Sequence, residues 1–183
     1  ISVIPEEIKT LREYLVDKRG MLFADNGGSN HWHRQFFNLM KQVLPTVRPI
    51  RVPLDHPIHQ VPYPMPFLPY VAPHGGKVAY GWRVGGRLVA YYHPGDLGDA
   101  WADGHAGLPA QSWEACCQLG VNVIFYAHME FSKSLAHSSK SLIPAESKQS
   151  ITKVPVTGEQ NATNSKTLNP LNSLIDDLLD DIK

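Results

Sequence analysis

The residues best suited to chemistry fall into two clusters, and each cluster follows an apolar run. The apolar runs are Met21–Ala24 and Leu88–Tyr92. Carboxylates, amides and imidazoles can bind hydroxyl groups, and glycines let a ligand approach the backbone closely. The two clusters consist of Asp25, Asn26, Gly27, Gly28, Ser29, His93, Asp96 and Asp99.

The order of residue types around the first cluster predicts a strand, then a loop, then a helix, and the second cluster again places acids and glycines just after a strand. Ser29 is a typical helix cap, and an aromatic run follows it. The carboxyl ends of parallel strands meet at one edge of a sheet, where α/β proteins bind ligands. We therefore expect Asp25, Asp55 and Asp96 to surround one concave site.

Further candidates lie in a proline-rich loop and on two tryptophans. Asp55 and His56 belong to the loop, where they could approach Asp25 or simply form an Asx-type turn. Trp32 or Trp101 could cover the apolar face of a sugar. Alternatively, Asp25 and Asp96 cap helices and bind loop amides. The predicted ligand-binding set is Asp25, Asn26, Gly27, Gly28, Ser29, Trp32, Asp55, His56, His93, Asp96, Asp99 and Trp101.

A metal site would draw on oxygen and imidazole ligands, but no standard spacing is present. His31 and His33 are two residues apart, so on a regular helix they face apart. We assign no metal and no other cofactor. The residues that could supply such ligands are Asp25, His31, His33, Asp55, His56, His93, Asp96 and Asp99.

The glycine pair could hold a phosphate through backbone amides, but the signature is incomplete. The run from Asn26 to Ser29 lacks the lysine of a P-loop and the three-glycine dinucleotide motif. Asp25 would also repel a strongly anionic ligand. A small neutral polar molecule such as a sugar fits these residues better.

Composition predicts one domain at 1–131, a flexible linker at 132–168 and an acidic amphipathic helix at 169–183. Every aromatic residue lies at or before Phe131, so the remainder cannot build a core. Basic and acidic residues number 17 each, which argues against nucleic acid as a partner. No apolar run or leader indicates membrane insertion, so a cytoplasmic location is the default expectation.

Residue periodicity places the elements around the clusters. We expect a helix from Pro5 to about Lys18, a hairpin over Lys77–His93 and a helix over Pro109–Phe131, although Val121–Tyr126 also suits a strand. Leu88–Tyr92 is apolar throughout, which predicts a central strand. A helix before the first strand implies an earlier parallel strand, so we expect the domain to be incomplete at its N-terminus, and poorly stable or oligomeric alone.

The C-terminal segment has one wholly apolar helical face and four aspartates elsewhere. A helix from about Pro170 to Ile182 would be marginal alone in water and would need a surface, either a groove on this domain or a protein partner. The apolar residues that would make this contact are Leu171, Leu174, Ile175, Leu178, Leu179 and Ile182.

Taken in order, these motifs resemble the bacterial domain of unknown function 4159. The matching pieces run from Pro5 to about Ala127 and include FADNGGS, LDHPI, GRLVAYYHPGDLGDAW and QLGVNVIFYA. More distantly, the chain is similar to ThuA-like proteins of the class I glutamine amidotransferase-like superfamily. That resemblance implies a flavodoxin-like three-layer α/β/α fold.

The resemblance does not supply a catalytic residue. Amidotransferases carry a nucleophilic cysteine at a strand-to-helix turn, whereas Cys116 and Cys117 lie on a predicted helix. We therefore do not expect glutaminase activity, and Ser29 is better explained as a cap. A binding or regulatory domain for a small polar molecule is the favoured function. The alternative is a hydrolase or isomerase that acts on a small polar substrate through Asp25 and a histidine, with or without the help of a metal ion.

Overall fold

The computed structural model describes residues 1–27, 29–71, 77–102 and 104–141. These residues belong to one compact unit, Ile1–Pro144. The predictions for Gly28, for the linker beyond 141 and for the 169–183 helix lie outside the described residues. No described helix is both long enough and apolar enough to cross a membrane.

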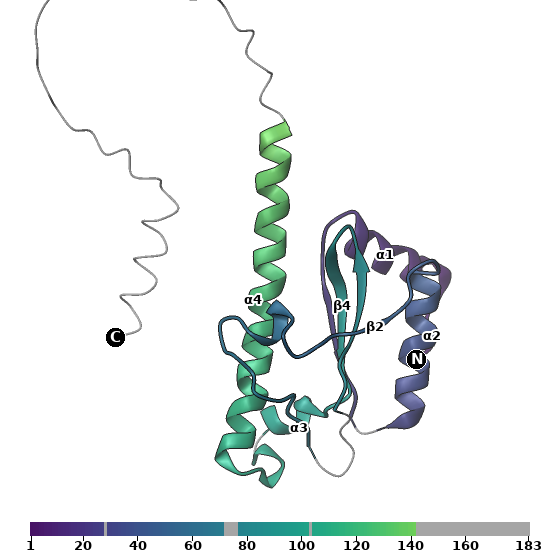
Figure 1. The fold of residues 1–183 in the computed structure, drawn as a ribbon. Helices are drawn as coiled ribbons and strands as arrows, with labels where there is room; N and C mark the ends of the chain where they lie inside the picture. Colours follow the sequence, from purple (N-terminus) through teal and green to yellow (C-terminus); the bar gives the residue numbers. More distant parts are fainter. Residues whose placement is uncertain (28, 72–76, 103, 142–183) are drawn as a thin grey trace, which may run out of the picture. The chain divides into compact units, whose positions relative to one another are not determined.

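A mixed four-stranded sheet forms the centre of the described unit (Figure 1). Its order is β1 (Leu22–Asp25), β4 (Arg87–His93), β3 (Tyr80–Val84) and β2 (Ile50–Arg51). β1 and β4 are parallel, whereas the β4–β3 and β3–β2 pairs are antiparallel. The α/β class is therefore confirmed, and so is the central place of the strand that contains Leu88–Tyr92.

The hairpin between β3 and β4 turns at Gly85 and Gly86, as predicted. Their φ angles are 58° and 85°, and both fall in the region that a two-residue hairpin turn requires. The turn fixes the register, which pairs Val84 with Arg87 and Tyr80 with Tyr92.

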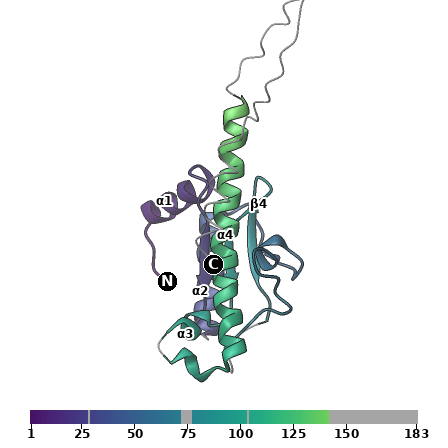
Figure 2. The same ribbon diagram turned by 90° about the vertical axis from the view of Figure 1, so that its left-hand side faces the viewer.

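Helices cover both faces of the sheet (Figure 2). On one face, α1 (Pro5–Val16) and α2 (Asn30–Val43) pack against a cluster that contains Trp82 and Tyr92. On the other face, α4 (Ala110–Ser141) packs against Tyr91 and Leu88. The short elements are η1 (Pro57–His59), α3 (Leu97–Trp101) and η2 (His105–Gly107).

Two helix predictions can be compared directly with the structure. Ser29 caps α2, because its side chain accepts a hydrogen bond from the Trp32 amide at 3.2 Å. The late segment is helical, so the strand alternative for Val121–Tyr126 is wrong. α4 also continues beyond Phe131 to Ser141, so residues 132–141 of the expected flexible linker are helical.

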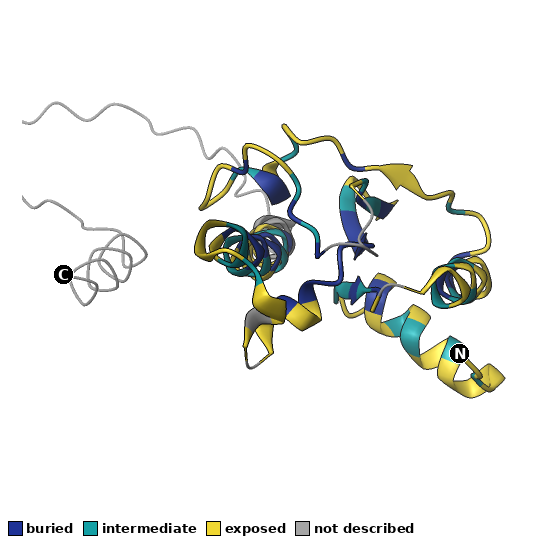
Figure 3. Cartoon of the chain, turned by 90° about the horizontal axis from the view of Figure 1, so that it is seen from below, coloured by how far each residue is buried: buried dark blue, intermediate teal, exposed yellow. Residues whose placement is uncertain are grey.

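Burial is greatest along β4, where every residue from Leu88 to His93 is buried (Figure 3). Side chains alternate across a strand, so Tyr91 faces α4 and Tyr92 faces α2. The middle and the carboxyl end of this strand therefore have little access to water, whereas Arg87 at its start is partly exposed.

Gly81 should tolerate no side chain, because a Cβ there would lie 2.7 Å from Leu88 Cδ2 and 2.9 Å from Val52 Cγ2. We predict that Gly81→Ala lowers the free energy of unfolding by about 1–3 kcal/mol. Gly85→Asn is the matched control, since asparagine accepts a positive φ and open space surrounds this position. Equal unfolding free energies for the two variants in urea would contradict the overpacking explanation.

Candidate functional site

The two polar clusters meet at the carboxyl ends of β1 and β4. Asp25 and His93 are register partners in the parallel pair. The Asp25 carboxylate accepts hydrogen bonds from the amides of Asn26 and Gly98, both at 2.8 Å. The first cluster is therefore tied directly to the loop that follows β4.

Asp25 has a structural role at the start of α3. The amides of Asp96 and Leu97 also stabilise its charged form, together with those of Gly98 and Asn26. Burial nevertheless raises the pKa of the carboxyl group, because desolvation outweighs these hydrogen bonds. Asp25 thus supplies the cap that the Asp96 side chain does not provide.

Asp96 itself occupies a left-handed backbone conformation, with φ 56° and ψ 45°. It is buried, and this turn directs the chain from β4 into α3. Aspartate is one of the few residues with a side chain that enters this region readily. The left-handed backbone conformation at this position therefore explains why an aspartate occurs there.

On the α2 face, three polar side chains form a connected set. The Tyr92 hydroxyl accepts from Asn26 Nδ2 at 2.9 Å and lies 2.9 Å from His33 Nδ1. Because it already accepts from Asn26, the hydroxyl can give its one hydrogen to His33 Nδ1, and in that arrangement a neutral imidazole carries its N–H on Nε2. Burial favours this arrangement because it lowers the pKa of His33 and raises that of Tyr92 to about 12.

This connected set borders a small pocket of about 250 Å³. We call it the strand-end pocket, and it lies against the ends of β1 and β4. Amides, an imidazole, a phenol and one cation line it, and none of the described lining residues is a carboxylate. The lining residues are Asn26, Asn30, His33, Lys77, Val78, Tyr80 and Pro94.

On the α4 face, a second polar set is wholly buried. His59 Nδ1 donates to the Pro53 carbonyl at 2.8 Å, so Nε2 accepts from the Tyr91 hydroxyl at 2.8 Å. His93 Nε2 donates to the Pro69 carbonyl at 2.6 Å. Burial lowers the pKa of both His59 and His93 to about 4, so both are neutral at pH 7.

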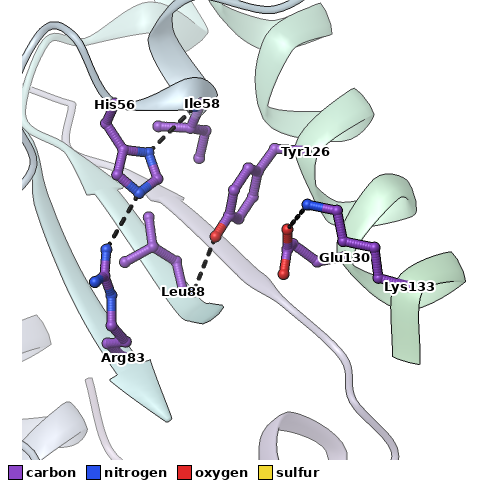
Figure 4. A network of polar contacts seen from close by, with 7 residues as sticks. All are labelled: His56, Ile58, Arg83, Leu88, Tyr126, Glu130 and Lys133. Atoms are coloured by element: carbon purple, nitrogen blue, oxygen red, sulfur yellow. Dashed lines mark hydrogen bonds and ion pairs between the residues drawn. The ribbon is translucent and has the colours of Figure 1, made fainter. Parts of the chain in front are cut away.

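His56, which follows Asp55 in the loop, lies beside Arg83 and Leu88 and not with the strand-end residues (Figure 4). His56 Nε2 lies 3.4 Å from Arg83 Nη2, near Leu88 at the hairpin end of β4. Leu88 and His93 are five residues apart on one strand, or about 17 Å. The expectation that Asp55 would share a site with Asp25 is therefore not met, because the loop packs beside the opposite end of β4.

Neither tryptophan lines the strand-end pocket. Trp32 stacks on Phe36, with ring centroids 5.3 Å apart, and belongs to the α2-side core. Trp101 donates from Nε1 to the Cys116 carbonyl at 3.2 Å and packs against Phe23. The aromatic ring available to a ligand in this pocket is Tyr80.

The remaining predicted residues separate into exposed and buried positions. Gly27, Ser29 and Asp99 are exposed, whereas His93 is fully buried. Sequence reasoning missed Asn30, Lys77 and Tyr80 as pocket residues, and it missed His59 altogether. Of these four residues, only Tyr80 had a signal in the sequence, because it alternates with Trp82 on one face of a predicted strand.

The described part of the chain contains no group of three His, Cys, Asp or Glu side chains arranged to hold a metal ion. Burial raises the pKa of Cys116 to about 11, so its thiol is protonated at neutral pH. Cys116 and Cys117 are not disulfide-bonded.

We predict that Tyr92→Phe destabilises the domain by about 1–3 kcal/mol, because the buried Asn26 amide and His33 lose a shared partner. Tyr80→Phe is the control, since its hydroxyl makes no hydrogen bond within the described part of the chain. Chemical denaturation of both variants measures the difference. A Tyr92→Phe variant as stable as Tyr80→Phe would contradict the role given to this hydroxyl.

Stability should fall as the pH is lowered from 7 to 5. The pKa of His59 and of His93 is about 4 in the folded chain, whereas the ordinary value of 6.5 applies to the unfolded chain. Between pH 7 and pH 5, therefore, only the unfolded chain binds a proton at these two residues. The expected loss is about 2 kcal/mol for each histidine. Urea titrations at several pH values test this.

Two variants separate this effect from general acid sensitivity. His59→Gln should give a shallower pH dependence, whereas replacing the exposed His31 in the same way should not change it. An unfolding free energy that stays constant between pH 7 and 5 would show that the buried histidines are not the cause.

Comparison with known proteins identifies the family but no function. No curated protein matches the chain. The model of a family described as domain of unknown function (DUF4159) matches residues 1–128, as the order of motifs predicted. The strand-end pocket and both polar sets fall within the matched residues, and the chain belongs to the DUF4159 family.

Proposed function

We propose that this domain binds a small polyhydroxylated molecule, neutral or singly anionic, in the strand-end pocket. The observation that carries the proposal is a concavity at the ends of two parallel strands, lined by amides, a neutral imidazole and a phenol. Ligands of α/β proteins bind at this end of the strands. The volume, about 250 Å³, suits a monosaccharide-sized molecule.

The chemistry of the lining supports hydroxyl recognition. Amide groups of Asn26 and Asn30 can donate and accept, and His33 Nε2 can donate. The Tyr80 ring can cover the apolar face of a sugar, which is the role predicted for Trp32 or Trp101. Lys77 adds one positive charge, so a carboxylate on the ligand is tolerated.

A ligand-binding or regulatory role is favoured over catalysis because backbone amides already occupy the Asp25 carboxylate. Both of its oxygens accept amide hydrogen bonds, and the residue does not line the pocket. A hydrolase or isomerase would need this carboxylate, or a histidine, free to exchange a proton with the substrate. Of the nearby histidines, His93 is fully buried, so His33, through Nε2, is the one that a catalytic alternative would use.

We also propose that the domain is a ThuA-like member of the class I glutamine amidotransferase-like superfamily, with a flavodoxin-like three-layer architecture. A parallel strand pair with helices on both faces supports this relationship. The protonated thiol of Cys116 and the absence of a cysteine after β1 argue that glutaminase chemistry is not part of it.

The test uses glucose and gluconate as probes with the full chain. We expect both to raise the melting temperature and to shift the NMR signals of His33 and Asn26. Asn30→Ala should lower the affinity for both probes about 10-fold, which corresponds to one lost hydrogen bond. Lys77→Met should lower the affinity for gluconate only.

Lys41→Met is the matched control, since Lys41 lies on α2 outside this pocket. It should leave both affinities unchanged. Signal changes that map away from the pocket, or no binding of either probe at millimolar concentration, would refute the proposal. Turnover of either probe would instead favour the catalytic alternative.

A further inference from the structure

A second concavity lies between α2 and β3, further from the strand ends than the first. Its volume is about 470 Å³, which falls in the range of small-molecule binding sites. Residues of α2, of β3 and of the connection from α2 to β2 line it, and we call it the basic pocket. The lining residues that bear on binding are Phe37, Asn38, Lys41, Val47, Arg48 and Trp82.

The basic pocket and the strand-end pocket are separate sites. No described residue lines both of them. Phe37 of the basic pocket contacts Tyr80 of the strand-end pocket, with ring centroids 5.2 Å apart, so these two rings stand between the cavities. The basic pocket also lies on the β2 side of the sheet, whereas β1 is at the opposite side.

The elements that line the basic pocket carry no negative side chain. Lys41 and Arg48 are exposed and both line the pocket. α2, the connection after it, β2 and β3 contain no aspartate or glutamate, and none occurs anywhere from residue 26 to residue 54. Basic and acidic residues number 17 each in the whole chain, so their separation creates a local positive potential at this site.

Both cations are available to a ligand. Neither Lys41 nor Arg48 forms an ion pair or a side-chain hydrogen bond with another described residue. The carbonyl groups at the end of α2 would oppose an anion through their partial negative charge, but Arg12 binds them. Its Nε donates to the Val43 carbonyl at 2.6 Å, and its Nη2 donates to the Gln42 carbonyl at 2.7 Å.

The inner wall of the basic pocket is aromatic. Trp82 is only 1% exposed and packs against Phe37, with ring centroids 5.3 Å apart. The Trp82 indole N–H forms no hydrogen bond within the described part of the chain, although a buried indole usually finds an acceptor. An oxygen atom of a ligand in this pocket would supply one.

We propose that the basic pocket binds a small organic carboxylate with an apolar body, such as an arylalkyl acid. Phe37 and Val47 provide apolar surface for the body of the ligand. The Arg48 guanidinium can bind the carboxylate through two parallel hydrogen bonds, and Lys41 adds a second positive charge. This ligand class differs from the polyhydroxylated molecule assigned to the strand-end pocket, so the two sites are independent.

Isothermal titration calorimetry of the full chain with three probes tests the proposal. We expect 3-phenylpropionate to bind and to shift the NMR signal of the Trp82 indole N–H. The neutral 3-phenylpropionamide has the same shape, and its affinity should be at least about 10-fold lower because charge-assisted hydrogen bonds are lost. Gluconate has the charge without the apolar body, so it should leave the Trp82 signal unchanged.

Two variants assign the charge to this pocket. Arg48→Met should lower the affinity for 3-phenylpropionate about 10-fold and leave that for the amide unchanged. Lys77→Met is the matched control, because Lys77 lines the strand-end pocket, and it should change neither affinity. Arg48 is exposed, so circular dichroism should show an intact fold. Neither Arg48→Met nor Lys41→Met should alter the affinity for gluconate.

Three results would overturn the proposal. The first is equal affinity for the acid and its amide, or no binding of the acid at millimolar concentration. The second is an unchanged affinity of Arg48→Met for the acid. The third is a set of signal changes at His33 and Asn26 without one at Trp82, since those two residues report on the strand-end pocket.

Discussion

The burial of β4 on both faces is the constraint on which the rest of the domain depends. A strand that is covered by helices on both sides must satisfy its polar groups inside the protein or at its ends. β4 carries two tyrosines and a histidine in its buried part. Each tyrosine directs its hydroxyl to a histidine, Tyr91 to His59 and Tyr92 to His33. These bonds connect the central strand to η1 on one face and to α2 on the other.

The same constraint explains why the acids at the strand ends are structural. The chain leaving β4 must reverse direction to reach α3 and then α4. Asp96 provides the left-handed turn, and the Asp25 carboxylate binds the amides at the start of α3. A carboxylate engaged in this way holds two parallel strand ends together. The neighbouring concavity, which no carboxylate lines among the described residues, is the site that we propose for a ligand.

α4 covers one face of the sheet. Its buried side completes the core with Leu119 and Val123. Another side is open to solvent within the described part of the chain, where Ile124 is 60% exposed. The helix therefore contributes to the core through one side only.

Local patterns in the sequence determined much of this architecture. The glycine pair fixed the hairpin, Ser29 fixed the start of α2, and the apolar run of β4 required a central strand, because each depends on neighbouring residues only. Tertiary structure alone decided which polar residues meet. His59 and Tyr91 are far apart in the chain, and the Asp55 loop packs at the hairpin end because its path depends on contacts with α4. Residue type alone indicated Asp25 as a ligand-binding candidate, but only the fold shows that its carboxylate oxygens bind backbone amides.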